Sequence, residues 1–146
     1  MLGPVRLRPP LPSDAPELAA LAGELGYHTD PEALLGRLAS LSPTDAAVIV
    51  ATDADDSPVG WCQVELFRSL VEPLSALIVG LVVGEGHRSE GIGVALLAAA
   101  ERWARARGCR RMLVATRITR ERAHRFYWRE GYGVNKTSYF LDKPLD

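Results

Sequence analysis

The stretch LVVGEGHRSEGIGVALL, residues 81–97, joins the end of an apolar strand pattern to an apolar helix pattern. Gly91 and Gly93 stand where the helix pattern begins, and Arg88 comes just before them. A helix N-terminus carries up to four unpaired N–H donors and a partial positive charge, and glycines let an anion approach those donors closely. The stretch therefore predicts a phosphate-binding turn at the carboxyl end of a central strand, with Arg88 adding a fixed charge.

Two common nucleotide-binding patterns do not fit this turn. Gly86 and Gly91 have the spacing G-x-x-x-x-G, but Ile92 and Gly93 stand where a nucleoside-triphosphate loop needs Lys and Ser or Thr. The dinucleotide pattern G-x-G-x-x-G fails because Leu96 stands at its third glycine position. A phosphotransferase is therefore disfavoured, and a helix start that binds no ligand remains the alternative.

Length and composition predict a single domain over residues 1–146. The chain is 47% hydrophobic and 24% charged with a net charge of −1, which is enough apolar material for one core. Its basic residues are interleaved with apolar ones, so no nucleic-acid partner is expected. The longest apolar run, residues 76–84, is far shorter than the ~18 residues of a membrane span, and the first residues lack a signal-peptide core. We therefore expect a cytoplasmic protein with no membrane partner.

The cysteines and the acidic residues give no sign of a metal site. Cys62 and Cys109 stand far apart, which provides neither a disulfide framework nor a metal-ligand cluster. The acids of DADDSP, residues 53–58, are typical of a solvated turn. We therefore expect no metal, and we expect both cysteines to act as small buried hydrophobic residues.

Hydrophobic periodicity predicts an α/β fold with the element order β-α-α-β-β-β-α-β-α-β. The strand–helix–strand succession after residue 76 predicts a parallel pair joined by a right-handed crossover, so the central sheet is mixed and has helices on both faces. Gly80, inside a predicted strand, indicates a bulge or a close backbone approach. The strands are expected at residues 5–8, 46–52, 59–67, 76–83, 111–116 and 132–145, and the helices at residues 13–26, 30–41, 92–108 and 119–130.

Residues 81–109 resemble the coenzyme A motif of the GNAT superfamily of N-acetyltransferases. The family pattern R/Q-x-x-G-x-G/A stands here as RSEGIG, residues 88–93. A second signature, a helix with Ala and Tyr ahead of Gly and an aromatic residue, stands as AHRFYWREGY, residues 123–132. The chain departs from the pattern at Arg120, where many relatives have Asn. The order of elements is also similar, so the resemblance covers nearly the whole chain.

The resemblance implies direct transfer of an acetyl group from acetyl-CoA, the cosubstrate, to a primary amine of a small molecule or a protein. It implies that backbone amides of the turn hold the pyrophosphate and that the preceding strand pairs with the pantetheine arm. In the family an amide at a bulge in this strand polarises the thioester carbonyl, and Leu81 and Val83 are the candidates for that donor. The cofactor-binding candidates are Leu81, Val82, Val83, Arg88, Ser89, Glu90, Gly91, Ile92, Gly93 and Val94.

The reaction requires two proton transfers, and the resemblance suggests a residue for one of them. Tyr127 matches the family's general-acid tyrosine, because a phenol is protonated at neutral pH and can protonate the departing thiolate. Alternatively, Tyr127 is only the inward aromatic residue of an amphipathic helix. An alkyl amine arrives protonated and must lose a proton before it attacks. The resemblance does not define the base. Glu65, which shares a strand face with Trp61 and Gln63, is the candidate, Glu85 and His87 after the central strand are alternatives, and a solvated surface position is the other reading for each. Tyr27 and His28 are the candidates for acceptor binding.

Two hypotheses about function therefore stay open, an N-acetyltransferase and a non-catalytic CoA-binding or regulatory domain that keeps the same turn. The acceptor is not defined, because acceptor-side residues lie on helices and loops that vary most within the superfamily. The predicted final strand contains KTSYFLDK, residues 136–143, and such an edge can pair with a second copy. A homodimer is therefore a candidate assembly.

Overall fold

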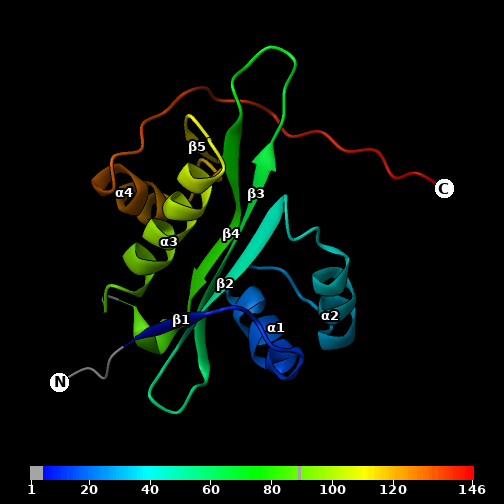
Figure 1. Ribbon diagram of the computed structural model, residues 1–146, viewed down its shortest axis with the longest axis vertical. Coiled ribbons are helices and arrows are strands. Elements are labelled where there is room, and N and C mark those ends of the chain that lie inside the picture. The colour runs from blue at the N-terminus through cyan, green and yellow to red at the C-terminus, as the bar shows by residue number, and fades with distance from the viewer. Residues whose placement is uncertain (1–4, 89) are drawn as a thin grey trace. The chain divides into compact units, whose positions relative to one another are not determined.

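The computed structural model describes residues 5–88 and 90–146 (Figure 1). Within it the chain forms two compact units, Met1–Ala115 and Thr116–Asp146. The described part of the first unit contains the strands and three of the helices, and the second contains the helix α4.

The first unit is built on a mixed sheet with the strand order β1-β2-β3-β4-β5. Neighbouring strands from β1 to β4 are antiparallel, whereas β5 runs parallel to β4. This difference follows from the connections, because α3 carries the chain across between β4 and β5 and a crossover returns the strand in the same direction. The predicted mixed sheet is therefore confirmed. Its strands are β1 Arg6–Arg8, β2 Ala46–Thr52, β3 Pro58–Phe67, β4 Ser75–Val83 and β5 Met112–Val114.

Helices cover both faces of this sheet (Figure 1). A Cβ atom at Gly60 of β3 would meet the side chains of Ile92 and Leu96 in α3. The next residue, Trp61, donates from its indole Nε1 to the carbonyl oxygen of Leu18 in α1 at 3.2 Å. Because successive strand residues face opposite ways, α1 and α3 lie on opposite faces. The helices are α1 Ala15–Glu24, α2 Pro31–Ser40 and α3 Ile92–Ala106, and short 3₁₀ helices occupy Pro12–Asp14 and Glu85–His87.

The core lies on both faces of the sheet. On the α3 face the apolar side of the helix meets equally inaccessible strand residues; the central members are Ala51, Cys62, Val64, Leu96, Leu97 and Ala100. On the opposite face Val50 and Val82, which both pair with Trp61, are buried, as are Leu18 and Leu21 of α1. Burial raises the pKa of the Cys62 thiol to about 12, so this cysteine serves as the small hydrophobic residue that was predicted. Cys109 is only half-buried.

The second unit contains α4, Glu121–Arg129, followed by a segment without regular secondary structure. The strand predicted over residues 132–145 is therefore wrong. Tyr139 and Phe140 belong to the segment that was predicted to be a strand, and their side chains are 94% and 98% exposed. A strand forms only where a neighbour pairs its N–H and C=O groups, and no described strand pairs with this segment. None of the helices in the described part of the chain has the length and apolarity that a bilayer span requires.

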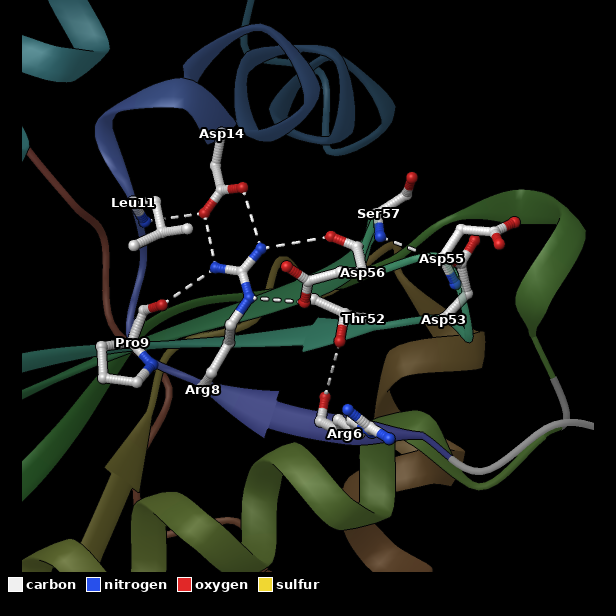
Figure 2. Close-up of polar contacts among 10 residues, drawn as sticks. All are labelled: Arg6, Arg8, Pro9, Leu11, Asp14, Thr52, Asp53, Asp55, Asp56 and Ser57. Carbon is white, nitrogen blue, oxygen red and sulfur yellow. Dashed lines mark hydrogen bonds and ion pairs between the residues drawn. The ribbon is translucent and has the colours of Figure 1, made fainter.

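One guanidinium joins three separate segments of the first unit (Figure 2). Arg8 of β1 donates two hydrogen bonds to the carboxylate of Asp14, at 2.7 and 3.0 Å, and one to the carboxylate of Asp56, at 2.9 Å. Asp14 is 5% exposed and also accepts the backbone N–H of Leu11 at 2.7 Å. The hydrogen bonds from Arg8 hold the pKa of Asp14 below its usual range. Arg8 thus ties β1 to the start of α1 and to the β2–β3 turn.

We expect the variant Asp14→Asn to lower the free energy of unfolding at pH 7 by about 2 kcal/mol, because it breaks a largely buried ion pair. The pKa of Asp14 is lower in the folded chain than in the unfolded chain. The stabilisation is therefore complete above pH about 4 and is lost as the pH falls through the folded-state pKa. Urea unfolding of both proteins between pH 7 and pH 2.5 should show the two stabilities converging in acid.

The matched control is Asp45→Asn, which removes the exposed partner of Arg68, an ion pair whose side chains are 61% and 48% exposed. Solvated pairs of this kind contribute a few tenths of a kcal/mol. If both variants lose the same stability, Arg8 does not have the structural role assigned to it.

Candidate functional site

The candidate site is centred on an irregularity in β4. Gln63 of β3 pairs with Gly80, but the next residue, Val64, pairs with Ile78. Val79 is therefore an extra residue without a counterpart on β3, which defines a β-bulge. The bulge predicted at Gly80 is confirmed. Bulges of this kind redirect the backbone groups beside them, and here they do so next to the end of β5.

β4 and β5 separate at the bulge. β5 pairs with β4 only between Ala76 and Ile78, and no other described strand covers the β5 side of β4 beyond that point. The N–H of Gly84 donates to the carbonyl oxygen of Val59 in β3 at 2.8 Å. Because backbone groups alternate in direction along an antiparallel strand, those of residues 81 and 83 are directed away from β3. The β4 edge therefore offers backbone donors and acceptors in the gap left by β5.

The three strand residues predicted to bind the cofactor consequently differ from one another. Leu81 and Val83 direct their backbone groups toward the open edge, as the pairing above requires. Val82 pairs with Trp61 of β3, and its side chain is 3% exposed. The structure thus places two of these residues, but not Val82, at the open edge.

The predicted turn leads directly into α3. Gly91 is its N-cap with a φ of 79°, a left-handed conformation that strains any residue with a Cβ atom. No side chain among the described residues caps the helix, and the first backbone bond runs from Ala95 N–H to the Gly91 carbonyl oxygen at 3.0 Å. The N–H groups of Ile92, Gly93 and Val94 thus precede the helical bonding pattern. The turn has the backbone donors and the partial positive charge that an anion needs.

Charged side chains surround this turn. Arg88 Nη2 lies 3.7 Å from Glu24 Oε1, and the same carboxylate oxygen accepts the backbone N–H of Glu85 at 2.8 Å. On the other side, His87 Nδ1 lies 3.4 Å from Glu90 Oε2. Glu24, at the end of α1, is a site residue that the sequence analysis missed, because no local pattern links it to a turn 61 residues away. Ser89, also predicted to bind the cofactor, lies outside the described residues.

The candidates for acceptor binding occupy two places in the first unit. Tyr27 and His28 are exposed in the loop between α1 and α2, three residues or so after Glu24, which contacts the turn. Glu65 is half-buried on β3 and pairs with Leu77, on the side of the bulge away from the turn. The structure therefore places the end of α1 against the turn through Glu24, and it places Glu65 in the strand that pairs with the bulged strand β4.

Tyr127 belongs to the second unit. It lies on α4, is 8% exposed, and packs edge-on against Phe126 and Tyr132, with ring centroids 5.1 and 5.5 Å away. This packing is compatible with a proton donor and with a purely structural aromatic residue. Arg120 is the N-cap of α4 and makes no side-chain cap hydrogen bond, so the departure from Asn leaves this helix start without its usual type of cap.

An apolar groove of about 690 Å³ lies elsewhere in the first unit, along residues 7–12, α2 and the first half of β2. Among the described residues that line it, Arg8 is the one with a charged side chain, and its guanidinium is already bound to Asp14 and Asp56. The groove includes neither the turn nor the bulge. Its apolar lining is also unsuited to a charged amine. Among the described residues, no group of three or more His, Cys, Asp or Glu could hold a metal ion.

Comparison with known proteins gives a consistent result. A model of the acetyltransferase (GNAT) family matches residues 16–132. The aminoglycoside N(6′)-acetyltransferase type 1 of Stenotrophomonas maltophilia is 30% identical over 145 residues, which is 96% of this chain and 94% of that protein. The protein of the same name from Klebsiella aerogenes is 32% identical over 103 residues, 68% of each chain.

Solved structures show the same fold. The aminoglycoside 6′-N-acetyltransferase AAC(6′)-Ih from Acinetobacter baumannii superimposes with a TM-score of 0.84 at 16% identity, covering 98% of this chain and 100% of that one. AAC(6′)-Iy, in complex with the bisubstrate analogue CoA-S-monomethyl-acetylneamine, has a TM-score of 0.82 at 20% identity with the same coverage. At these identities the likeness concerns the fold.

Proposed function

This chain belongs to the acetyltransferase (GNAT) family and transfers acetyl groups from acetyl-CoA to amines, and from that premise we propose that its acceptor is an amino sugar of the aminoglycoside class. The observation that carries the proposal is the 30% identity, over 96% of the chain, to an aminoglycoside N(6′)-acetyltransferase. The alternative of a non-catalytic CoA-binding domain is set aside, because the named relatives are enzymes.

We propose that the turn and the open β4 edge bind acetyl-CoA, which supplies the activated acetyl group. The amides of residues 91–94 would hold the pyrophosphate, and Arg88 would exchange Glu24 for a phosphate oxygen. A Cβ atom at Gly91 would project into open space, so the cradle has room for a bulky anion. Leu81 and Val83 would pair with the pantetheine arm through their backbone groups, as a neighbouring strand does.

The acceptor amine must lose a proton before it attacks, since an alkyl ammonium has a reference pKa of about 10.4. We propose that Glu65 takes this proton, directly or through a water molecule. We also propose that Tyr27 and His28 contact the acceptor. Both side chains are exposed in the loop between α1 and α2, where an acceptor can reach them, and this exposure supports the assignment.

Turnover with a panel of amines tests the choice of acceptor. We expect thiol release from acetyl-CoA with aminoglycosides that carry a 6′-amino group, and a kcat/KM at least about 100-fold lower with matched compounds that carry a 6′-hydroxyl group. The panel should include polyamines, amino acids and peptides with free N-termini or lysines. Turnover confined to peptides or proteins would refute an amino sugar as the acceptor.

We propose that Tyr127 is the general acid that protonates the departing thiolate. The variant Tyr127→Phe keeps the packed ring and removes the hydroxyl group, so we expect kcat to fall about 100-fold while the melting temperature stays close to that of the wild type. Tyr139→Phe, which removes an exposed hydroxyl group from the same unit, is the matched control and should leave kcat unchanged. If Tyr127→Phe retains the wild-type kcat across the pH range, Tyr127 is a structural residue only.

We further propose that the C-terminal segment associates with a second copy of the chain. Its apolar side chains Tyr139, Phe140 and Leu141 are at least 86% exposed, and such a cluster is typical of a surface that is covered in an assembly. Sedimentation should therefore show a dimer for the wild type and a monomer for Phe140→Asp. Asn135→Asp adds the same charge at a polar position of the segment and should remain dimeric. A wild-type monomer at every concentration would rule out this assembly.

A further inference from the structure

The ring of Trp61 occupies the space that a side chain at position 80 would need. A Cβ atom at Gly80 would lie 2.9 Å from Cζ3 and 3.0 Å from Cη2 of the Trp61 ring, closer than real Cβ contacts. On its other side, the indole Nε1 donates to the carbonyl oxygen of Leu18 in α1 at 3.2 Å. The ring is therefore held between α1 and the backbone of β4.

Gly80 stands at a sensitive point of β4. It follows the extra residue Val79, and its carbonyl group shares a peptide plane with the N–H of Leu81, which is directed toward the open edge. Glycine has more backbone freedom than any other residue, so the orientation of this plane is poorly determined by Gly80 itself. A ring packed directly on Gly80 removes that freedom.

We propose that Trp61 is a positioning residue for acetyl transfer. Its ring, anchored on Leu18, holds the peptide group between Gly80 and Leu81 so that the Leu81 N–H is aimed at the thioester carbonyl oxygen. The inference rests on the acetyl transfer and on the proposed placement of acetyl-CoA along β4. It does not depend on which amine is the acceptor.

The donor matters because charge develops on that oxygen. The amine nitrogen gives its electron pair to the acetyl carbonyl carbon, and the π electrons of the carbonyl group move to the oxygen. When they return, the C–S bond breaks, the sulfur leaves with the electron pair and takes a proton, and the new amide nitrogen releases one. A fixed N–H stabilises the oxygen most when it is most negative, so a misaligned donor lowers kcat more than it weakens cofactor binding.

A double-mutant cycle tests this arrangement. The variant Gly80→Ala forces the Trp61 ring off β4. We expect its kcat to fall about 30-fold, which is less than the loss expected when an oxyanion donor is removed altogether. The KM for acetyl-CoA should change less than about threefold. In the Trp61→Leu background the clash is absent. Adding Gly80→Ala to Trp61→Leu should therefore lower kcat by less than about threefold relative to Trp61→Leu alone. Gly36→Ala, at a position on α2 that faces open space, is the matched control and should match the wild type.

The carbonyl group can also be observed without any acceptor. The dethia analogue of acetyl-CoA, a ketone in which CH₂ replaces the thioester sulfur next to the carbonyl group, should show a lowered C=O stretching frequency when it is bound to the wild type. In Gly80→Ala the frequency should return toward that of the free analogue, with affinity retained. Because this measurement needs no amine, a wrong acceptor class leaves it unaffected, whereas an unshifted frequency in the wild type would refute the role of Leu81.

Trp61→Phe covers the case in which Gly80→Ala does not fold. Phenylalanine keeps an aromatic ring over Gly80 but loses the hydrogen bond to Leu18, so kcat should fall about three- to tenfold at an unchanged KM for acetyl-CoA. A wild-type kcat in Trp61→Phe, or fully additive effects of Gly80→Ala and Trp61→Leu, would overturn the proposal.

Discussion

The separation of β5 from β4 after Ile78 is the constraint on which the rest of the site depends. A parallel strand that continued along β4 would pair the backbone groups that now face the gap. The bulge at Val79 makes the separation abrupt, because it shifts the register of β4 at the residue after the last β4–β5 pair. The crossover helix α3 must begin near the carboxyl end of β4, so its free N–H groups and the open strand edge arise from the same connection.

A second constraint is the pairing of charges at the turn before α3. The start of α3 and Arg88 favour an anion, but in the described structure Arg88 faces Glu24 instead. Glu24 has a further partner, the backbone N–H of Glu85, so it stays in place when Arg88 turns to another anion. A phosphate bound as proposed would therefore compete with a carboxylate for the guanidinium, and the contact between Glu24 and Glu85 would remain. The same carboxylate stands at the end of α1, just before the loop of Tyr27 and His28.

The sequence predicted those features that local patterns determine. Alternation and helical periodicity located the strands from β1 to β5 and all four helices, and the glycines marked the turn and the bulge, since each reflects the conformation of one short segment. The roles of Glu24 and Trp61 were not predicted, because their hydrogen-bond partners, Glu85 and Leu18, lie on other elements. The final strand was wrong for a related reason: alternation shows that residues 132–145 are able to form a strand, but a strand also needs a neighbour.

The difference between what the sequence predicted and what it did not predict has a chemical basis. The groups proposed to hold the cofactor are main-chain N–H and C=O groups, and main-chain geometry leaves a trace in the sequence wherever it demands glycine, as at Gly91. The groups that would choose an acceptor are side chains on α1, its following loop and β3, and no backbone rule requires a particular residue there. A short motif therefore predicts the transferred group, whereas side chains placed by long-range packing leave no local pattern, as the contact of Glu24 with the turn illustrates.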